Sequence, residues 1–337
     1  MSEVTAVIGA GAWGTTIAWL LGSKGLPVRL WARSEQQAEV IAATHTNETR
    51  LPGVTLPESV AATSDLAWVV EEAQHVVVAV PSEHVRGVAG RLAAHLPEGA
   101  RIISATKGLE LTTGKRMSEV LGEETGLPPE RLLALSGPNL SGEIAAGMPA
   151  VSVVAGVCPE AVAACQRLLA TALFRTYGNC DILGVEMCGA LKNVIALAAG
   201  INDGLGYGAN AKAALLTRGL AEISRLGIRL GADRATFWGV AGVGDMVATS
   251  SSRLSRNWQV GYQLGSGQNH ETALASQAGV AEGVRTTAAA ADLAERVGVE
   301  APIITALRAV LFEGREPEDA VRELMTRPGR SEAENLA

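Results

Sequence analysis

The sequence has few aromatic and few charged residues, and it contains no long basic or apolar run. Aromatic side chains make up 4% of the 337 residues, so Ala, Val, Leu and Gly must fill the core. Charged residues account for 19% and the formal net charge is −7. Without a Lys/Arg-rich run, nothing indicates binding to nucleic acid.

No apolar run approaches the roughly 20 residues of a membrane span, and no basic leader followed by an apolar stretch precedes the first predicted strand. The four cysteines form no CxxC pair, and no histidine lies at zinc-finger spacing from them, which predicts reduced thiols and no metal site: Cys158, Cys165, Cys180 and Cys188. We therefore expect a cytoplasmic protein without a membrane span. With 47% hydrophobic residues the chain can build a sizeable core, and its length predicts about two domains.

The first half of the chain alternates short apolar runs with helical stretches. This alternation predicts right-handed crossovers and a parallel sheet. The predicted strands are Val4–Ile8, Val28–Trp31, Val76–Val80, Arg101–Thr106, Leu132–Leu135, Val151–Val154 and Phe174–Tyr177, and the predicted helices between the first strands are Thr15–Leu21 and Glu35–Ala43.

From about Asp181–Gly184 onward, helical patterns dominate. The predicted helices are Val185–Ala199, Ala209–Arg225, Asn257–Leu264, Val284–Val297, Pro302–Phe312 and Pro317–Met325. We therefore expect an α/β domain over 1–183, an all-helical domain over 184–326, and a polar tail over 327–337 that frays.

The turn Gly9-Ala10-Gly11-Ala12-Trp13-Gly14 follows the first strand and opens a helix. In that context, G-x-G-x-x-G is the fingerprint of a Rossmann-type dinucleotide-binding domain. Gly9 allows the tight turn, Gly11 lets the backbone approach a pyrophosphate, and Gly14 allows close packing of the helix. The helix N-terminus then offers N–H groups and a partial positive charge to the phosphates.

The second strand ends in Trp31-Ala32-Arg33-Ser34, where NAD-selective folds commonly place an acid. The Arg33 guanidinium can pair with a 2′-phosphate or stack on adenine, so NADP is accepted at least as well as NAD. A plain surface arginine is the structural alternative.

Two lysines are candidates for the chemistry. Lys107 follows the strand Arg101–Thr106, at the edge where open α/β sheets bind ligands, although a solvated loop lysine would fit the same position. Lys192 is the only cation between Glu186 and Asp203. At 100° per residue it shares with Asn193 a small, lightly polar helix face, where close approach is expected. A surface lysine reaching for water is the alternative.

Two polar clusters lie between the later helices. Gly242-Val243-Gly244-Asp245 is one, and Ser255-Arg256-Asn257 is the other. A Ser-Arg-Asn cluster at a helix start can clamp a phosphate with a guanidinium and N–H groups. Ser255 and Asn257 can equally serve as a simple helix cap.

Together these pieces resemble the bacterial-type NAD(P)-dependent glycerol-3-phosphate dehydrogenase family, from Val4 to about Met325. The motifs that carry the resemblance are Gly9–Thr15, Val80–Ser82, Thr106–Glu110, Ser136–Pro138, Ala190–Asn193, Gly242–Asp245 and Ser255–Asn257. The resemblance implies interconversion of sn-glycerol 3-phosphate and dihydroxyacetone phosphate, which would supply phospholipid synthesis. A homodimer is left open.

The resemblance also assigns roles. Lys192 would be the general acid/base. The implied substrate contacts are Lys107, Gly137, Asn139, Lys192, Asp245, Ser255, Arg256 and Asn257. The implied NAD(P) contacts are Gly9, Gly11, Ala12, Trp13, Gly14, Arg33, Lys107, Ser141, Arg256, Val280 and Glu282. The family pattern usually has Ser or Thr where Asn139 stands, and often Ala where Ser141 stands.

Two other functions fit part of the pattern. A β-hydroxyacid or ketopantoate-type reductase would need a carboxylate-binding site in place of the Arg256 cluster. A protein that senses NAD(P) without turnover would not need Lys192 on a small helix face, nor Lys107. Turnover of NADPH with dihydroxyacetone phosphate distinguishes these possibilities.

Overall fold

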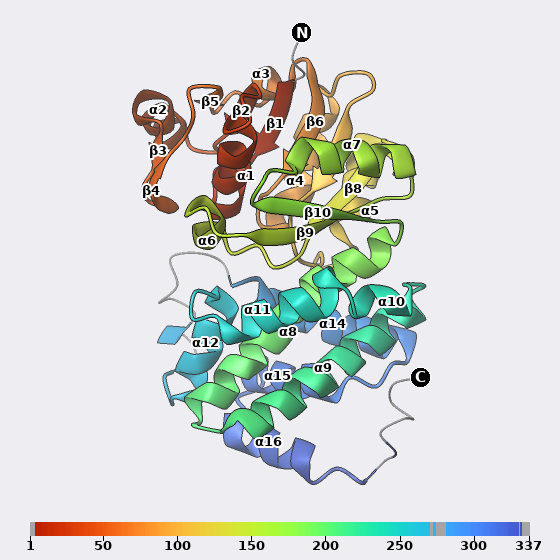
Figure 1. Ribbon diagram of the computed structural model, residues 1–337. Coiled ribbons are helices and arrows are strands. Elements are labelled where there is room, and N and C mark those ends of the chain that lie inside the picture. The colour runs from red at the N-terminus through yellow and green to blue at the C-terminus, as the bar shows by residue number, and fades with distance from the viewer. Residues whose placement is uncertain (1–3, 270–271, 274–280, 330, 332–337) are drawn as a thin grey trace. The chain divides into compact units, whose positions relative to one another are not determined.

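The computed structural model describes residues 4–269, 272–273, 281–329 and 331. The chain divides into two compact units, which are the subject of Figure 1. The first unit comprises Met1–Thr106 and Met117–Ile182, and the second comprises Lys107–Arg116 and Leu183–Ala337. The loop 107–116, which the sequence places within the predicted domain 1–183, thus groups with the helical unit.

Within its described residues, the first unit contains an eight-stranded sheet of order β10-β9-β8-β7-β6-β1-β2-β5. The strands are β1 Val4–Ile8, β2 Val28–Trp31, β5 Val60–Thr63, β6 Ala73–Val78, β7 Arg101–Ser104, β8 Leu132–Ser136, β9 Ala150–Ala155 and β10 Phe174–Asn179. The predicted strands are confirmed with small shifts at their ends. Three strands were not predicted: β5, and the separate pair β3 (Thr46–Asn47) and β4 (Leu51–Thr55).

The sheet is parallel except where β8 meets β9. At this one pair the predicted parallel pairing is wrong. The segment between these strands carries only the short helix α6 (Ser141–Ala145), which spans no crossover. The chain therefore reverses direction, and the two strands pair antiparallel.

Helices cover both faces of the sheet, because alternate residues along each strand point to opposite sides. Val7, Val77 and Ile103 pack in one apolar cluster with α1 and α7, while Ile8 and Ile102 pack in another with α4 and α5. The helices of this unit are α1 Ala12–Gly22, α2 Glu35–Thr44, α3 Leu66–Val70, α4 Ser82–Ala93, α5 Met117–Thr125, α6 and α7 Pro159–Leu169, with a 3₁₀ turn η1 at Pro129–Arg131.

In its described residues, the second unit is helical apart from the isolated bridge between Leu109 and Arg116. The six helices predicted for this unit are all present, and the short elements α10, η2 and α11 were not predicted. The elements are α8 Ile182–Gly204, α9 Ala209–Arg229, α10 Arg234–Phe237, the short π-helix η2 Val240–Gly244, α11 Asp245–Ser251, α12 Arg256–Gly265, α14 Glu282–Val297, α15 Pro302–Phe312 and α16 Pro317–Met325.

Helix α8 is the core helix of this unit. By length and composition it would qualify as a membrane span, contrary to the expectation that no segment does, but 83% of its most apolar stretch is buried inside the protein. Its small face lies against α12 at very short range. A Cβ added at Gly200 would come within 2.1 Å of the Trp258 carbonyl oxygen, and one at Gly261 within 2.0 Å of the Leu197 carbonyl oxygen. The close-approach face predicted around Lys192 therefore exists.

Candidate active site

The glycine-rich turn is crowded at its ends and open in the middle. Gly9 has φ +115°, and a Cβ there would lie 2.8 Å from the Ala79 carbonyl oxygen. A Cβ at Gly14 would lie 1.9 Å from the Gly9 carbonyl oxygen, whereas nothing lies within 4 Å of a Cβ placed at Gly11. Only glycine fits the two ends, and the middle has room for a ligand to approach the backbone.

Helix α1 begins next to this open space. Gly11 is its N-cap and supplies no side-chain hydrogen bond, and the first turn carries no acidic residue. The first N–H groups of any α-helix have no intrahelical acceptor. A backbone cradle of this kind fits a dinucleotide pyrophosphate.

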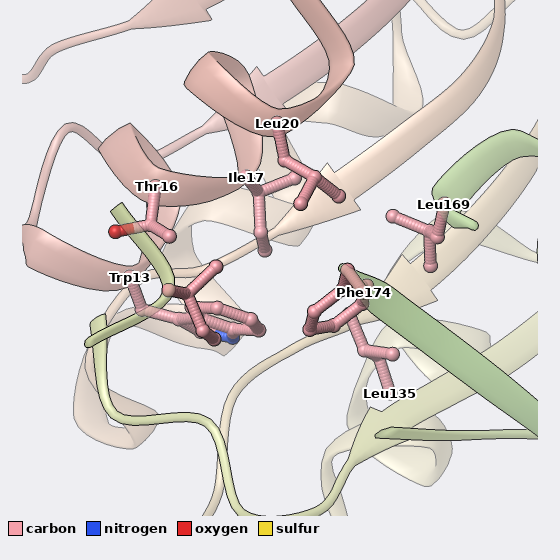
Figure 2. Close-up of a pocket in the computed structure, with 8 residues that line it drawn as sticks. Trp13, Thr16, Ile17, Leu20, Leu135, Leu169 and Phe174 are labelled. Carbon is pink, nitrogen blue, oxygen red and sulfur yellow. The ribbon is translucent and has the colours of Figure 1, made fainter. Parts of the chain in front are cut away.

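Trp13 lies in the first turn of α1, but its ring packs away from the glycine turn. It lines a small apolar pocket within the first unit, shown in Figure 2, together with Thr16, Ile17, Leu20, Leu135, Ile144, Leu169 and Phe174. Within the described part of the chain, the indole N–H has no hydrogen-bond partner. The predicted cofactor contacts of Ala12 and Trp13 stay predictions.

Arg33 follows β2 and is exposed. Its Nη1 lies 3.4 Å from Nε2 of His84 on α4. The next residue, Ser34, caps α2 by accepting the backbone N–H of Gln37. The guanidinium thus lies at the end of the second strand, where the adenosine ribose is expected.

Asn139 follows β8 and is held in one orientation. The Ser152 hydroxyl donates to the Ser136 carbonyl oxygen at 2.8 Å, so it must accept from Asn139 Nδ2, which lies 3.0 Å away. Asn139 Oδ1 is buried and has no partner in the described part of the chain. Gly137 has φ +138°, and Ser141 begins α6.

In the second unit, three charged side chains predicted from separate motifs meet. The Asp245 carboxylate, at the start of α11, binds Lys107 Nζ through Oδ2 at 2.8 Å and Lys192 Nζ through Oδ1 at 2.9 Å. Asp245 is 1% exposed and Lys192 is 6% exposed. The structure thus contradicts the alternatives of a solvated Lys107 and a surface Lys192.

Burial and the neighbouring opposite charges act against each other in this cluster. The pKa of Lys192 is lowered from 10.5 to about 8: burial is the largest cause, the positive charge of Lys107 acts in the same direction, and Asp245 opposes both. For Asp245, burial acts to raise the pKa, but the two lysines outweigh it and hold the pKa below its ordinary value. Lys192 can therefore exchange a proton near neutral pH, which an ordinary lysine does not.

Thr249 completes the cluster and is not among the site residues predicted from the sequence. Its hydroxyl accepts a hydrogen bond from Lys192 Nζ and donates to Asp245 Oδ1 at 3.0 Å. Asp245 and Thr249 are four residues apart on α11, a spacing that places side chains on one helix face. Helix α11 has only seven residues, too few to show a period in the sequence, so the sequence does not predict this pairing.

The Ser-Arg-Asn cluster has a structural role at the start of α12. Ser255 caps this helix by accepting the backbone N–H of Trp258, as the structural alternative requires. Asn257 is buried, donates to Asn193 Oδ1 on α8 and accepts the N–H of Gly283 on α14, both at 2.9 Å. Arg256 is exposed in the first turn. Phosphate binding by the cluster remains a prediction.

Comparison with known proteins decides which family has this arrangement. Two family models match, described as NAD-dependent glycerol-3-phosphate dehydrogenase N-terminus over residues 4–162 and C-terminus over residues 181–322. The chain belongs to the NAD-dependent glycerol-3-phosphate dehydrogenase family.

Proteins named glycerol-3-phosphate dehydrogenase [NAD(P)+] match along almost their whole length. The one from Geobacillus kaustophilus is 46% identical, with 99% of this chain and 97% of the relative covered. The one from Moorella thermoacetica is 47% identical, with 99% of each covered. A crystal structure of glycerol-3-phosphate dehydrogenase from Coxiella burnetii has a TM-score of 0.93 at 35% identity, covering 97% of this chain and 99% of that one.

The glycerol-3-phosphate dehydrogenase family assignment covers both units, so the predicted fold class is confirmed: a Rossmann-type α/β domain followed by a helical domain. The individual residue roles stay predictions. Glu282 begins α14, and Val280 lies outside the described residues.

Proposed function

We propose that this protein catalyses the NAD(P)-linked interconversion of sn-glycerol 3-phosphate and dihydroxyacetone phosphate. The observation that carries the proposal is the buried ammonium of Lys192, held by Asp245 and Thr249, with a pKa lowered to about 8. A group of this kind serves a reaction that moves one proton to or from a carbonyl oxygen. The names of the full-length relatives support the substrate.

The first unit would hold the dinucleotide, because its glycine turn and the α1 N-terminus fit a pyrophosphate. When bound, the nicotinamide supplies the hydride. Gly9, Gly11 and Gly14 would shape the cradle, and Arg33 would receive the adenosine ribose or its 2′-phosphate. Ser141, Arg256, Val280 and Glu282 complete the proposed set of cofactor contacts.

In the ketone-reducing direction, Lys192 would donate its proton to the carbonyl oxygen, and in the reverse direction it would take the proton back. Lys107 contributes a positive charge that favours the developing alkoxide. Asp245 keeps both ammonium groups in place. Arg256, with Ser255 and Asn257 at the same helix start, would bind the phosphate. Gly137 and Asn139 would contribute from the first unit.

The test is oxidation of NADPH by the purified protein with dihydroxyacetone phosphate, dihydroxyacetone or ketopantoate as acceptor. We expect turnover with dihydroxyacetone phosphate alone at micromolar to millimolar concentrations. Turnover with ketopantoate instead would favour the rival reductase. Tight NADPH binding, followed by fluorescence, without turnover of any acceptor would indicate a sensor.

The setting of the reaction is part of the proposal. Reduction would supply glycerol phosphate for phospholipid synthesis in the cytoplasm, and the protein would act as a homodimer. Cell fractionation and light scattering behind a sizing column check location and oligomeric state.

A further inference from the structure

The segment that delivers Lys107 is a closed loop with its own internal bonds. Leu109 and Arg116 pair as an antiparallel bridge, and the backbone N–H of Glu110 donates to the Lys115 carbonyl oxygen at 2.9 Å. The Thr113 hydroxyl donates to Glu110 Oε2 at 2.6 Å. These bonds tie the loop 107–116 together, so the position of Lys107 at its start depends on how the loop is anchored.

The loop is anchored to the helical unit at its far end. Arg116 Nη1 lies 2.7 Å from Oε2 of Glu186 on α8, and the two side chains are only 15% and 6% exposed. Arg296 on α14 adds a weaker, exposed contact by donating to the Thr113 carbonyl oxygen at 3.2 Å. Just before the loop, the Thr106 hydroxyl donates to the Val80 carbonyl oxygen at 2.7 Å, which holds Thr106 in the first unit.

Glu186 and Lys192 belong to the same helix, so the Glu186–Arg116 pair fixes the position of the loop relative to the helix that carries the proposed acid/base. A buried ion pair with good geometry fixes relative position more strictly than an exposed one. Without it, the loop would keep the exposed Arg296 contact and the Lys107–Asp245 pair itself. The Glu186–Arg116 pair is the contact of this loop that involves α8 directly.

We infer that Glu186 is a positioning residue for the reaction, which acts through Arg116 to hold the loop 107–116 so that Lys107 stays on Asp245 beside Lys192. This role rests on the proposed function of the same site. Glu186 touches neither substrate nor cofactor in this scheme. It would affect the reaction indirectly, by fixing the position of the positively charged Lys107 side chain beside Lys192.

The inference has a specific electrostatic consequence. Lys107 is one of the groups that lower the pKa of Lys192, and it also shares the Asp245 carboxylate. If the loop loosens and Lys107 leaves, Lys192 loses a repelling cation and keeps Asp245 to itself. Both changes raise the pKa of Lys192. A role of Glu186 in stability alone would leave that pKa unchanged.

The experiment compares Glu186→Gln and Arg116→Gln with the wild type in the whole enzyme. We expect kcat for dihydroxyacetone phosphate reduction to fall about 10- to 100-fold, the cost typical of a misplaced catalytic group. The Kd for NADPH should stay unchanged. The pH at which kcat declines should move upward in both variants, and the charge-reversed pair Glu186→Arg with Arg116→Glu should recover part of the loss.

The matched control is Glu222→Gln, which removes another buried carboxylate of the second unit, one bound to the start of α15. It should lower stability without moving the pH profile of kcat. A wild-type pH profile in Arg116→Gln would overturn the inference, even if Glu186→Gln failed to fold. Absence of any rescue in the reversed pair would also count against it.

A readout that needs no turnover separates this inference from the proposed function. The ammonium of Lys192 can be titrated by NMR after selective labelling of lysine, with Lys192→Met assigning the signal. Its pKa should rise in both single variants. If wild type reduces no acceptor but this shift occurs, the proposed function fails, while the coupling of Glu186 through Arg116 and Lys107 to Lys192 stands. If wild type is active and the shift is absent, the positioning role fails alone.

Discussion

Replacing Lys192 by methionine removes the ammonium while keeping an unbranched apolar stem in the narrow face of α8. Because burial lowers the pKa of Lys192 to about 8, the neutral amine is roughly 300-fold more populated at neutral pH than for a lysine at 10.5. About nine-tenths of the molecules still carry the proton at pH 7. The residue can therefore serve both directions, and Lys192→Met should lower kcat by about 10²- to 10⁴-fold.

The kcat of the wild type should depend on pH in opposite directions for reduction and for oxidation. Reduction needs the protonated ammonium, so its kcat should fall as pH rises through about 8. Oxidation needs the neutral amine, so its kcat should rise through the same pH. Initial rates from pH 6 to 10 in both directions, with saturating substrates, test this crossing directly.

The control is Lys212→Met, which removes a lysine bound to Asp203 at the other end of α8. It should keep kcat within a small factor of wild type and leave the pH profiles in place. NADPH binding should be near normal in both variants, because the glycine turn belongs to the other unit. Near-normal kcat in Lys192→Met, or wild-type profiles that are flat between pH 7 and 9, would refute the reasoning.

The geometry of the site and of the second unit supports four further predictions. Arg256→Ala should raise KM for the phosphorylated substrate by the equivalent of about 2–4 kcal/mol; a mutant that still prefers dihydroxyacetone phosphate over dihydroxyacetone as strongly as wild type would leave Arg256 outside the phosphate site. Arg33→Asp should weaken NADPH much more than NADH, with the difference shrinking at high salt, and equal losses in kcat/KM for the two cofactors would assign Arg33 to adenine or to packing. Gly14→Ala should lower both Tm and NADPH affinity, because its Cβ would meet the Gly9 carbonyl oxygen at 1.9 Å. Gly11→Ala, with open space around its Cβ, should weaken NADPH binding alone. Equal Tm values for the two variants would contradict the geometry. For Glu222, burial raises the pKa from 4.5 to about 7, although Ile303 and Ile304 donate backbone N–H groups to it, so the folded protein binds this proton more tightly than the unfolded chain. The resulting stability is present below about pH 4.5 and is lost as pH rises through 7, a change of about 3 kcal/mol in the free energy of unfolding. Chemical denaturation should find this change in wild type and not in Glu222→Gln.

Much of the fold could be read from the sequence because the signals were local. Buried parallel strands are short apolar runs, and Val4–Ile8 and Val28–Trp31 have the same bounds in the structure as in the prediction. The helices Pro302–Phe312 and Pro317–Met325 also have their predicted bounds, since proline opens each of them. Short elements such as α11 and β5 contain too few residues to show a period.

The glycine turn and Lys192 are the two parts of the candidate site that the sequence by itself determined. A turn with φ +115° at Gly9 and no room for a Cβ at Gly14 accepts only glycine, so the requirement is written in the residue types. A lone lysine on a face of small residues likewise indicates a buried charge, because a solvated helix face would carry more polar groups.

Only the tertiary structure decided how the separate motifs combine. Lys107, Lys192 and Asp245 come from a loop and two helices far apart in the sequence, and no local pattern states that one carboxylate binds both lysines. The same holds for Thr249 and for the ion pair of Arg116 with Glu186, each of which exists because packing removes water and brings opposite charges together. The sequence determined which chemical groups were available, and their pKa values and partners depend on burial, which is a property of the folded chain.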